Sequence, residues 1–88
     1  MITKKDAQVL RALGILPKPK YIRVTYLPFI DEVILLRPDA SYQKAIKFGE
    51  DYAKKHYKTT CGISVLTAER HILYDDSGRY YDGTSWPR

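Results

Sequence analysis

The sequence predicts an α+β fold in which an antiparallel sheet of about five strands packs against one long amphipathic helix. Residues 42–57 carry apolar side chains at three- and four-residue spacing, which is typical of a helix with one buried face. Several short segments rich in β-branched and aromatic residues are separated by Pro, Gly and Asp, as in strands joined by turns. The 88 residues suffice for one domain, with the expected element order α-β-β-α-β-β-β.

Residues 1–20 are expected to form a short helix and a connector, and residues 21–88 the sheet and helix core of the domain. Thr3 is suited to cap the N-terminus of the short helix, and Gly14 is suited to end it. Two prolines within residues 15–20 exclude a helix there, because each removes a backbone donor and favours extended geometry before it. This segment is therefore predicted to be an extended connector that carries two lysines.

Residues 21–27 and 32–37 are predicted to form the first two strands, joined by a turn at residues 28–31. Alternate residues of a strand face opposite sides of the sheet. In the first strand, Ile22, Val24 and Tyr26 share one face, and Tyr21, Arg23 and Thr25 share the other.

The long helix is predicted to begin after Asp39 or Ser41, either of which can cap it. One face is apolar and suited to the core: Tyr42, Ala45, Ile46, Gly49, Tyr52, Ala53 and His56 or Tyr57. The opposite face is mainly basic and suited to water or a partner: Lys44, Lys47, Asp51, Lys54, Lys55 and Lys58. Gly49 indicates a close approach of this helix to the sheet, because glycine inside a helix costs about 1 kcal/mol relative to alanine.

Residues 63–67, 71–74 and 79–81 are predicted to form three further strands. The segment Asp75-Asp76-Ser77-Gly78 is a strong turn signal between the last two of them. The resulting order of elements favours helices on one face of an antiparallel sheet, in two layers.

The chain is basic, with 15 Lys and Arg residues against 10 Asp and Glu residues and a net charge of +5. Most of the excess lies in residues 1–23 and 37–58. Such a field steers a protein toward polyanions or toward an acidic protein face. A chain this basic is not expected to be a DNA mimic.

No pattern in the sequence indicates catalysis. Cys61 can be matched with His56 or His71 only by residue type, because no third orienting residue or nucleophile elbow accompanies them. The same residues lack the paired spacing of zinc ligands, and the acidic turn lacks the register of a calcium loop. The five glycines are scattered singly, unlike those of a phosphate-binding loop. We therefore expect a protein that is not an enzyme and that uses no cofactor or metal.

The sequence predicts a cytoplasmic protein without a membrane contact. Its uncharged apolar runs stay short of the roughly 18 residues of a membrane span, and its first residues lack the apolar region of a secretory signal. A single cysteine fits a reducing compartment. A monomer or a weak homodimer is expected, the latter through an open sheet edge.

Tyrosine is enriched, with eight residues among 88. Tyrosines are frequent in protein interfaces and can stack on unpaired bases, whereas those on the apolar helix stripe are suited to the core. The predicted partner-binding residues combine the basic helix face with basic residues near the first strand and two tyrosines near the C-terminus. They are Lys44, Lys47, Lys54, Lys55, Lys58, Lys18, Lys20, Arg23, Tyr80 and Tyr81.

The layout of residues 21–82 resembles that of small bacteriophage proteins that inhibit host defence, the anti-CRISPR proteins among them. The likeness lies in a hairpin, one amphipathic lysine-bearing helix, and a final hairpin that reads Tyr74-Asp75-Asp76-Ser77-Gly78-Arg79-Tyr80-Tyr81-Asp82. The resemblance implies a phage or mobile-element accessory protein that inhibits a host nucleic-acid-handling defence complex by occupying its surface. The charge and the tyrosines predict that a basic, Tyr-rich surface docks on an acidic part of that complex. The alternative is a protein that binds nucleic acid directly, without sequence preference, through the same basic face.

Overall fold

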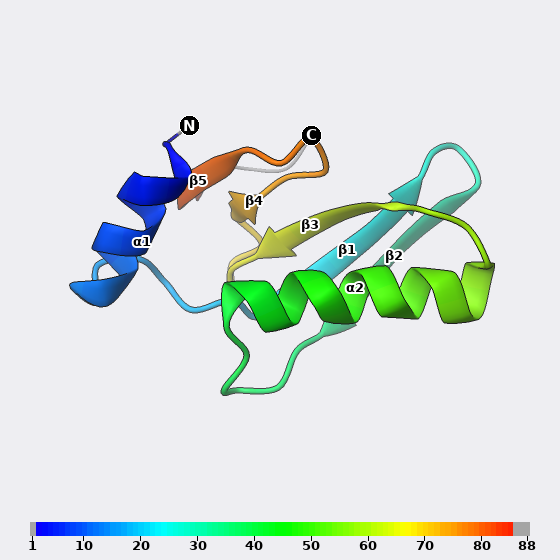
Figure 1. Ribbon diagram of the computed structural model, residues 1–88, viewed down its shortest axis with the longest axis horizontal. Coiled ribbons are helices and arrows are strands. Elements are labelled where there is room, and N and C mark those ends of the chain that lie inside the picture. Colours follow the sequence, from blue (N-terminus) through cyan, green and yellow to red (C-terminus); the bar gives the residue numbers. More distant parts are fainter. Residues whose placement is uncertain (1, 86–88) are drawn as a thin grey trace.

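The computed structural model describes residues 2–85, which form two helices and a five-stranded antiparallel sheet (Figure 1). The elements are α1 (Lys4–Ala12), β1 (Tyr21–Tyr26), β2 (Ile30–Leu35), α2 (Tyr42–Tyr57), β3 (Gly62–Leu66), β4 (Ile72–Tyr74) and β5 (Tyr80–Ser85). The predicted α+β class and the predicted antiparallel sheet of five strands are confirmed.

The strands lie side by side in the order β2-β1-β3-β4-β5, so β2 and β5 form the two edges of the sheet. The longer helix, α2, lies across one face of the sheet and contacts β1 and β3 (Figure 1). The short helix α1 lies at the other end of the molecule and contacts β5. The two helices therefore cover different parts of the sheet.

Local sequence signals account for the ends of both helices. The hydroxyl of Thr3 accepts a hydrogen bond from the backbone N–H of Asp6, and that of Ser41 accepts one from Lys44. Gly14 adopts a left-handed conformation, with φ of 72°, and two backbone hydrogen bonds close the end of α1 around it. The predicted caps at Thr3 and Gly14 are confirmed, and Ser41 rather than Asp39 caps α2.

Gly49 lies where α2 comes closest to the sheet. A Cβ atom at this position would be 2.8 Å from Cγ2 of Ile63 in β3 and 3.3 Å from Cδ1 of Ile22 in β1. Such distances are too short for a methyl group, so only glycine lets the helix approach the sheet this closely. The close approach predicted for this residue is confirmed.

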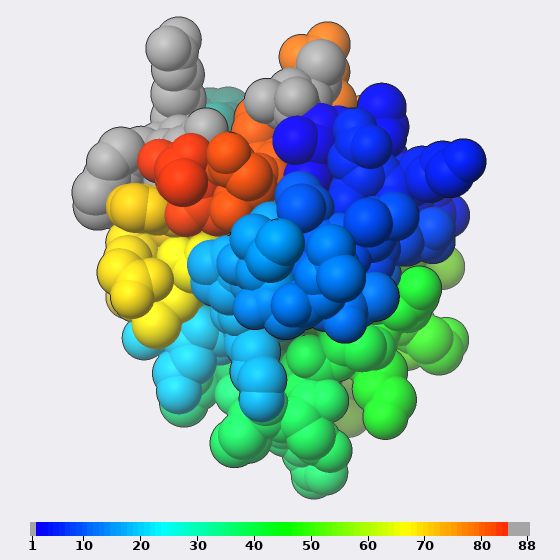
Figure 2. All heavy atoms as spheres, turned by 90° about the vertical axis from the view of Figure 1, so that its left-hand side faces the viewer, coloured from blue at the N-terminus to red at the C-terminus, as the bar shows by residue number. Residues whose placement is uncertain are grey.

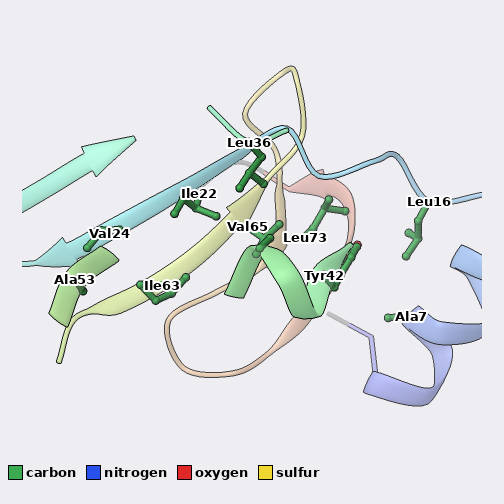
Figure 3. Close-up of a cluster of buried hydrophobic side chains, with 11 residues drawn as sticks. Ala7, Leu16, Ile22, Val24, Leu36, Tyr42, Ala53, Ile63, Val65 and Leu73 are labelled. Carbon is green, nitrogen blue, oxygen red and sulfur yellow. The ribbon is translucent and has the colours of Figure 1, made fainter. Parts of the chain in front are cut away.

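The core lies between α2 and the sheet and continues toward α1 (Figure 3). Ile22, Val24, Ile63 and Val65 from the two central strands face the buried stripe of α2. Ala7 and Leu16 extend the core to α1 and the connector, which explains how such a short helix is held in place.

Each of the five strands differs from its predicted range at one or both ends, and the largest differences are in the second and the last strand. The first turn is shorter than expected, because Ile30 and Asp31 pair with Tyr26 and Thr25 instead of lying in the loop. The second strand runs over Ile30–Leu35 and not over residues 32–37. The last strand was predicted at residues 79–81 but runs over Tyr80–Ser85, in pairing with β4.

Candidate partner-binding surface

The five predicted lysines of the long helix all lie on its solvent side. Lys44, Lys47, Lys54, Lys55 and Lys58 are exposed, whereas Tyr42, Ala45, Gly49 and Ala53 on the opposite side are buried. One ion pair moderates this charge, since Nζ of Lys47 lies 3.5 Å from Oδ2 of Asp51. Exposed pairs of this kind are weak, so the solvent side of α2 keeps a net positive charge, with lysines near both ends of the helix.

The tip of the β1–β2 hairpin carries exposed apolar side chains. Phe29 is 80% exposed, Leu27 is 67% exposed and Tyr26 is 49% exposed. The rings of Tyr26 and Phe29 lie side by side, with their centres 6.2 Å apart. Sequence reasoning missed this patch, although one signal could have revealed it: leucine and phenylalanine flank Pro28 where polar turn residues are usual.

Glu32 of β2 ties the hairpin to the C-terminal half of α2. Its Oε2 accepts a hydrogen bond of 2.8 Å from the hydroxyl of Tyr52, and its Oε1 accepts one from the hydroxyl of Tyr57. His56 stacks on the ring of Tyr52 at 4.1 Å, which stiffens the same side of the helix. The hairpin tip therefore lies near the end of α2 that carries three of the five lysines, as Figure 1 shows at its right-hand side.

These hydrogen bonds shift the pKa values of the groups that they join. Donation from Tyr57 and Tyr52 holds the pKa of Glu32 below its ordinary value of 4.5, with burial opposing the shift and the charge of His56 adding to it. The bond to Glu32 raises the pKa of Tyr57 to about 12, since ionised tyrosine could no longer donate to the carboxylate. The fold therefore favours an ionised Glu32 and neutral tyrosines.

We expect the free energy of unfolding to reflect the lowered pKa of Glu32. Its stabilising contribution is complete above pH of about 4.5 and is lost as the pH falls through the lower pKa of the folded state. The variant Glu32→Gln should therefore lose less stability than the wild type between pH 5 and pH 3, measured by urea unfolding. Glu69→Gln, which removes an exposed carboxyl group before β4, is the control and should follow the wild type. Equal pH dependence in all three proteins would contradict the coupling.

Three of the basic residues predicted at the site lie away from this surface. Lys18 and Lys20 are exposed in the connector between α1 and β1, at the opposite end of the molecule from the hairpin tip. Arg23 faces the side of the sheet that α2 does not cover, and its guanidinium makes two hydrogen bonds of 2.7 and 2.8 Å to Asp31. The structure therefore does not bring Arg23 together with the lysines of α2.

The two predicted tyrosines of β5 are engaged within the fold. The ring of Tyr80 stacks on Tyr42 with a centre-to-centre distance of 6.3 Å and meets the ring of Tyr74 edge-on at 5.1 Å. The hydroxyl of Tyr81 donates a hydrogen bond of 2.7 Å to Asp75. Both side chains are half-buried, so each contacts other residues of the domain and keeps part of its surface exposed.

Cys61, His56 and His71 are the residues whose types were considered for chemistry. Cys61 is a half-buried free thiol, and His56 is stacked on Tyr52. Nδ1 of His71 lies 2.9 Å from the carbonyl oxygen of Gly83. Within residues 2–85, no three His, Cys, Asp or Glu side chains gather as metal ligands would.

The same part of the chain contains no helix that is long and apolar enough to cross a membrane. In comparisons with known proteins, no family model matches the chain, and no significant match is found among curated proteins or solved structures.

Proposed function

We propose that this is a small non-enzymatic binding protein that docks the basic face of α2 and the apolar tip of the first hairpin on an acidic protein surface. The observation that carries the proposal is the proximity of the two features. Lys54 and Lys55 lie in the last turn of α2 and Lys58 caps it, and the hydrogen bonds of Glu32 hold that end of the helix beside the hairpin. Positive charge would orient the encounter, and the apolar tip would supply the contact energy.

The exposed apolar side chains favour a protein partner over nucleic acid. Leu27 has no π-face and no charge, so it contributes nothing to the phosphate contacts or base stacking through which nucleic acids are bound. Together with Tyr26 and Phe29 it would fit an apolar pocket with a polar rim, which is the usual composition of an interface hot spot, and the lysines of α2 would favour acidic residues in that rim.

The resemblance of residues 21–82 to phage inhibitors indicates the class of partner. We propose a host nucleic-acid-handling defence complex, inhibited in the host cytoplasm by occupation of its surface, as anti-CRISPR proteins do. A chain of 88 residues with a net charge of +5 suits such a role, because inhibition by occupation needs only one docking surface and no catalytic site.

Charge reversal on α2 tests the proposal. The variant Lys47→Glu/Lys54→Glu should weaken binding of proteins from a nuclease-treated bacterial lysate at least tenfold, because it places like charges against an acidic surface. The variant Lys5→Glu/Arg37→Glu makes the same change in net charge at exposed positions elsewhere and should bind as the wild type does. Equal loss in both variants would show that only net charge matters.

The five lysines on one helix face also support a second function, direct and non-specific binding of nucleic acid. Fluorescence anisotropy with labelled DNA and RNA, single- and double-stranded, separates the two functions. Tight binding at about 50 mM salt that collapses at about 200 mM, without sequence preference, would favour nucleic acid. If the wild type and Phe29→Ala bound nucleic acid with the same affinity, the hairpin tip would not take part in that binding.

A further inference from the structure

A small pocket lies between α1 and the first turns of α2, at the end of the molecule seen in Figure 2. Its volume is about 40 Å³, which is room for a small polar group. The lining residues are Lys4, Gln8 and Arg11 from α1, Tyr42, Gln43 and Ile46 from α2, and Tyr80 from β5. The lining therefore holds two cations and no carboxylate.

Two polar groups in this pocket are buried without a hydrogen-bond partner. Within residues 2–85, they are Nη1 of Arg11 and the hydroxyl oxygen of Tyr42. Tyr42 is only 1% exposed, and the guanidinium carbon of Arg11 lies 4.3 Å from the centre of its ring. The guanidinium thus lies over the ring of Tyr42, and each of the two polar groups loses hydration without gaining an internal hydrogen bond.

Both unsatisfied groups are hydrogen-bond donors. Guanidinium cannot accept a hydrogen bond, and burial raises the pKa of Tyr42 to about 12, a shift that the charge of Arg11 opposes. The hydroxyl therefore keeps its proton. Two donors from residues that line one pocket, one of them charged, with a second cation at Lys4, match an oxyanion.

We propose that this pocket binds the side-chain carboxylate of an acidic residue on the partner. The identity of the partner rests on the proposed function, because an acidic protein surface would supply such a carboxylate. One carboxylate oxygen would accept from Nη1 of Arg11 and from the hydroxyl of Tyr42, while the ammonium group of Lys4 would add attraction at the rim. The pocket and the hairpin tip would then anchor the two ends of one docking face, with the lysines of α2 between them.

Titration of the isolated protein with sodium acetate tests the pocket directly. Acetate should cause saturable NMR shifts in the side-chain signals of Arg11 and Tyr42, at constant ionic strength maintained with sodium chloride. Chloride alone should cause none. A second titration uses sodium phosphate. Saturation at a lower concentration of phosphate than of acetate would overturn the assignment to a carboxylate. If neither anion gave saturable shifts, the anion site itself would be overturned.

Two variants locate the response. Tyr42→Phe keeps the ring and removes one donor, so acetate should bind about tenfold more weakly. Lys5→Gln removes an exposed cation of α1 that does not line the pocket and should bind acetate as the wild type does. Equal acetate affinity in wild type and Tyr42→Phe would overturn the proposal. The acetate titration involves neither the partner nor the hairpin tip, so a negative result would contradict the pocket without contradicting the proposed function. A negative result in the lysate experiment would contradict the proposed function without contradicting the pocket.

Discussion

Replacing Phe29 by alanine is expected to weaken binding of the partner roughly 30-fold, without a measurable change in the stability of the protein. The side chain is 80% exposed and contributes little to the core, so its removal should not affect folding. An aromatic side chain that fills a desolvated pocket of its partner is commonly worth about 2 kcal/mol or more. The measurement is the retention of a given lysate protein by immobilised wild type and immobilised Phe29→Ala over a series of concentrations.

Leu13→Ala provides the matched control for this prediction. Leu13 is also a strongly exposed apolar residue, but it lies at the end of α1, far along the chain from the hairpin. Its loss should leave partner binding within about twofold of the wild type. Equal weakening by both substitutions would indicate general surface hydrophobicity and would remove the special role of the hairpin tip.

Replacing Gly49 by valine is expected to lower the free energy of unfolding by about 3 kcal/mol. Valine would place its Cβ 2.8 Å from Cγ2 of Ile63 and add two methyl groups in the same space. Ile63 is buried and branched at Cβ, so it cannot move aside, and the helix must lift from the sheet. Urea unfolding followed by circular dichroism measures the loss.

The neighbouring substitution Glu50→Val separates packing from helix propensity. Glu50 is exposed on α2, so valine there should cost only a few tenths of a kcal/mol. If Gly49→Val were as stable as Glu50→Val, the close contact between α2 and the sheet would not exist in solution.

The features that could be predicted from the sequence are those set by near neighbours along the chain. Thr3 and Gly14 bound a helix because capping depends on a few consecutive residues. Gly49 within the apolar stripe correctly indicated a close approach of the helix to the sheet. Glycine lowers the stability of a helix, so its presence on a buried face suggests that a larger side chain would not fit there. The lysine face of α2 follows from the same periodicity.

The features that were not predicted from the sequence depend on contacts between segments far apart in the chain. Arg23 was predicted to support the lysine face, but the short first turn pairs Thr25 with Asp31, and that register brings the carboxylate diagonally to Arg23. Tyr80 was predicted to be a contact residue, and the sequence did not indicate that its half-buried ring stacks on Tyr42 of α2. The spacing of residues along a single segment does not predict the ion pair of Arg23 or the position of the Tyr80 ring, because both depend on segments far apart in the sequence.

Site-specific crosslinking tests the central claim most directly. A photoreactive phenylalanine analogue at position 29, irradiated in nuclease-treated bacterial lysate, should form a discrete adduct with one protein. The same analogue at position 13 should not form that adduct, and Lys47→Glu/Lys54→Glu in the chain labelled at position 29 should abolish it. Adducts of equal yield from both positions, or no protein adduct from position 29, would contradict the assignment of the docking surface to α2 and the hairpin tip.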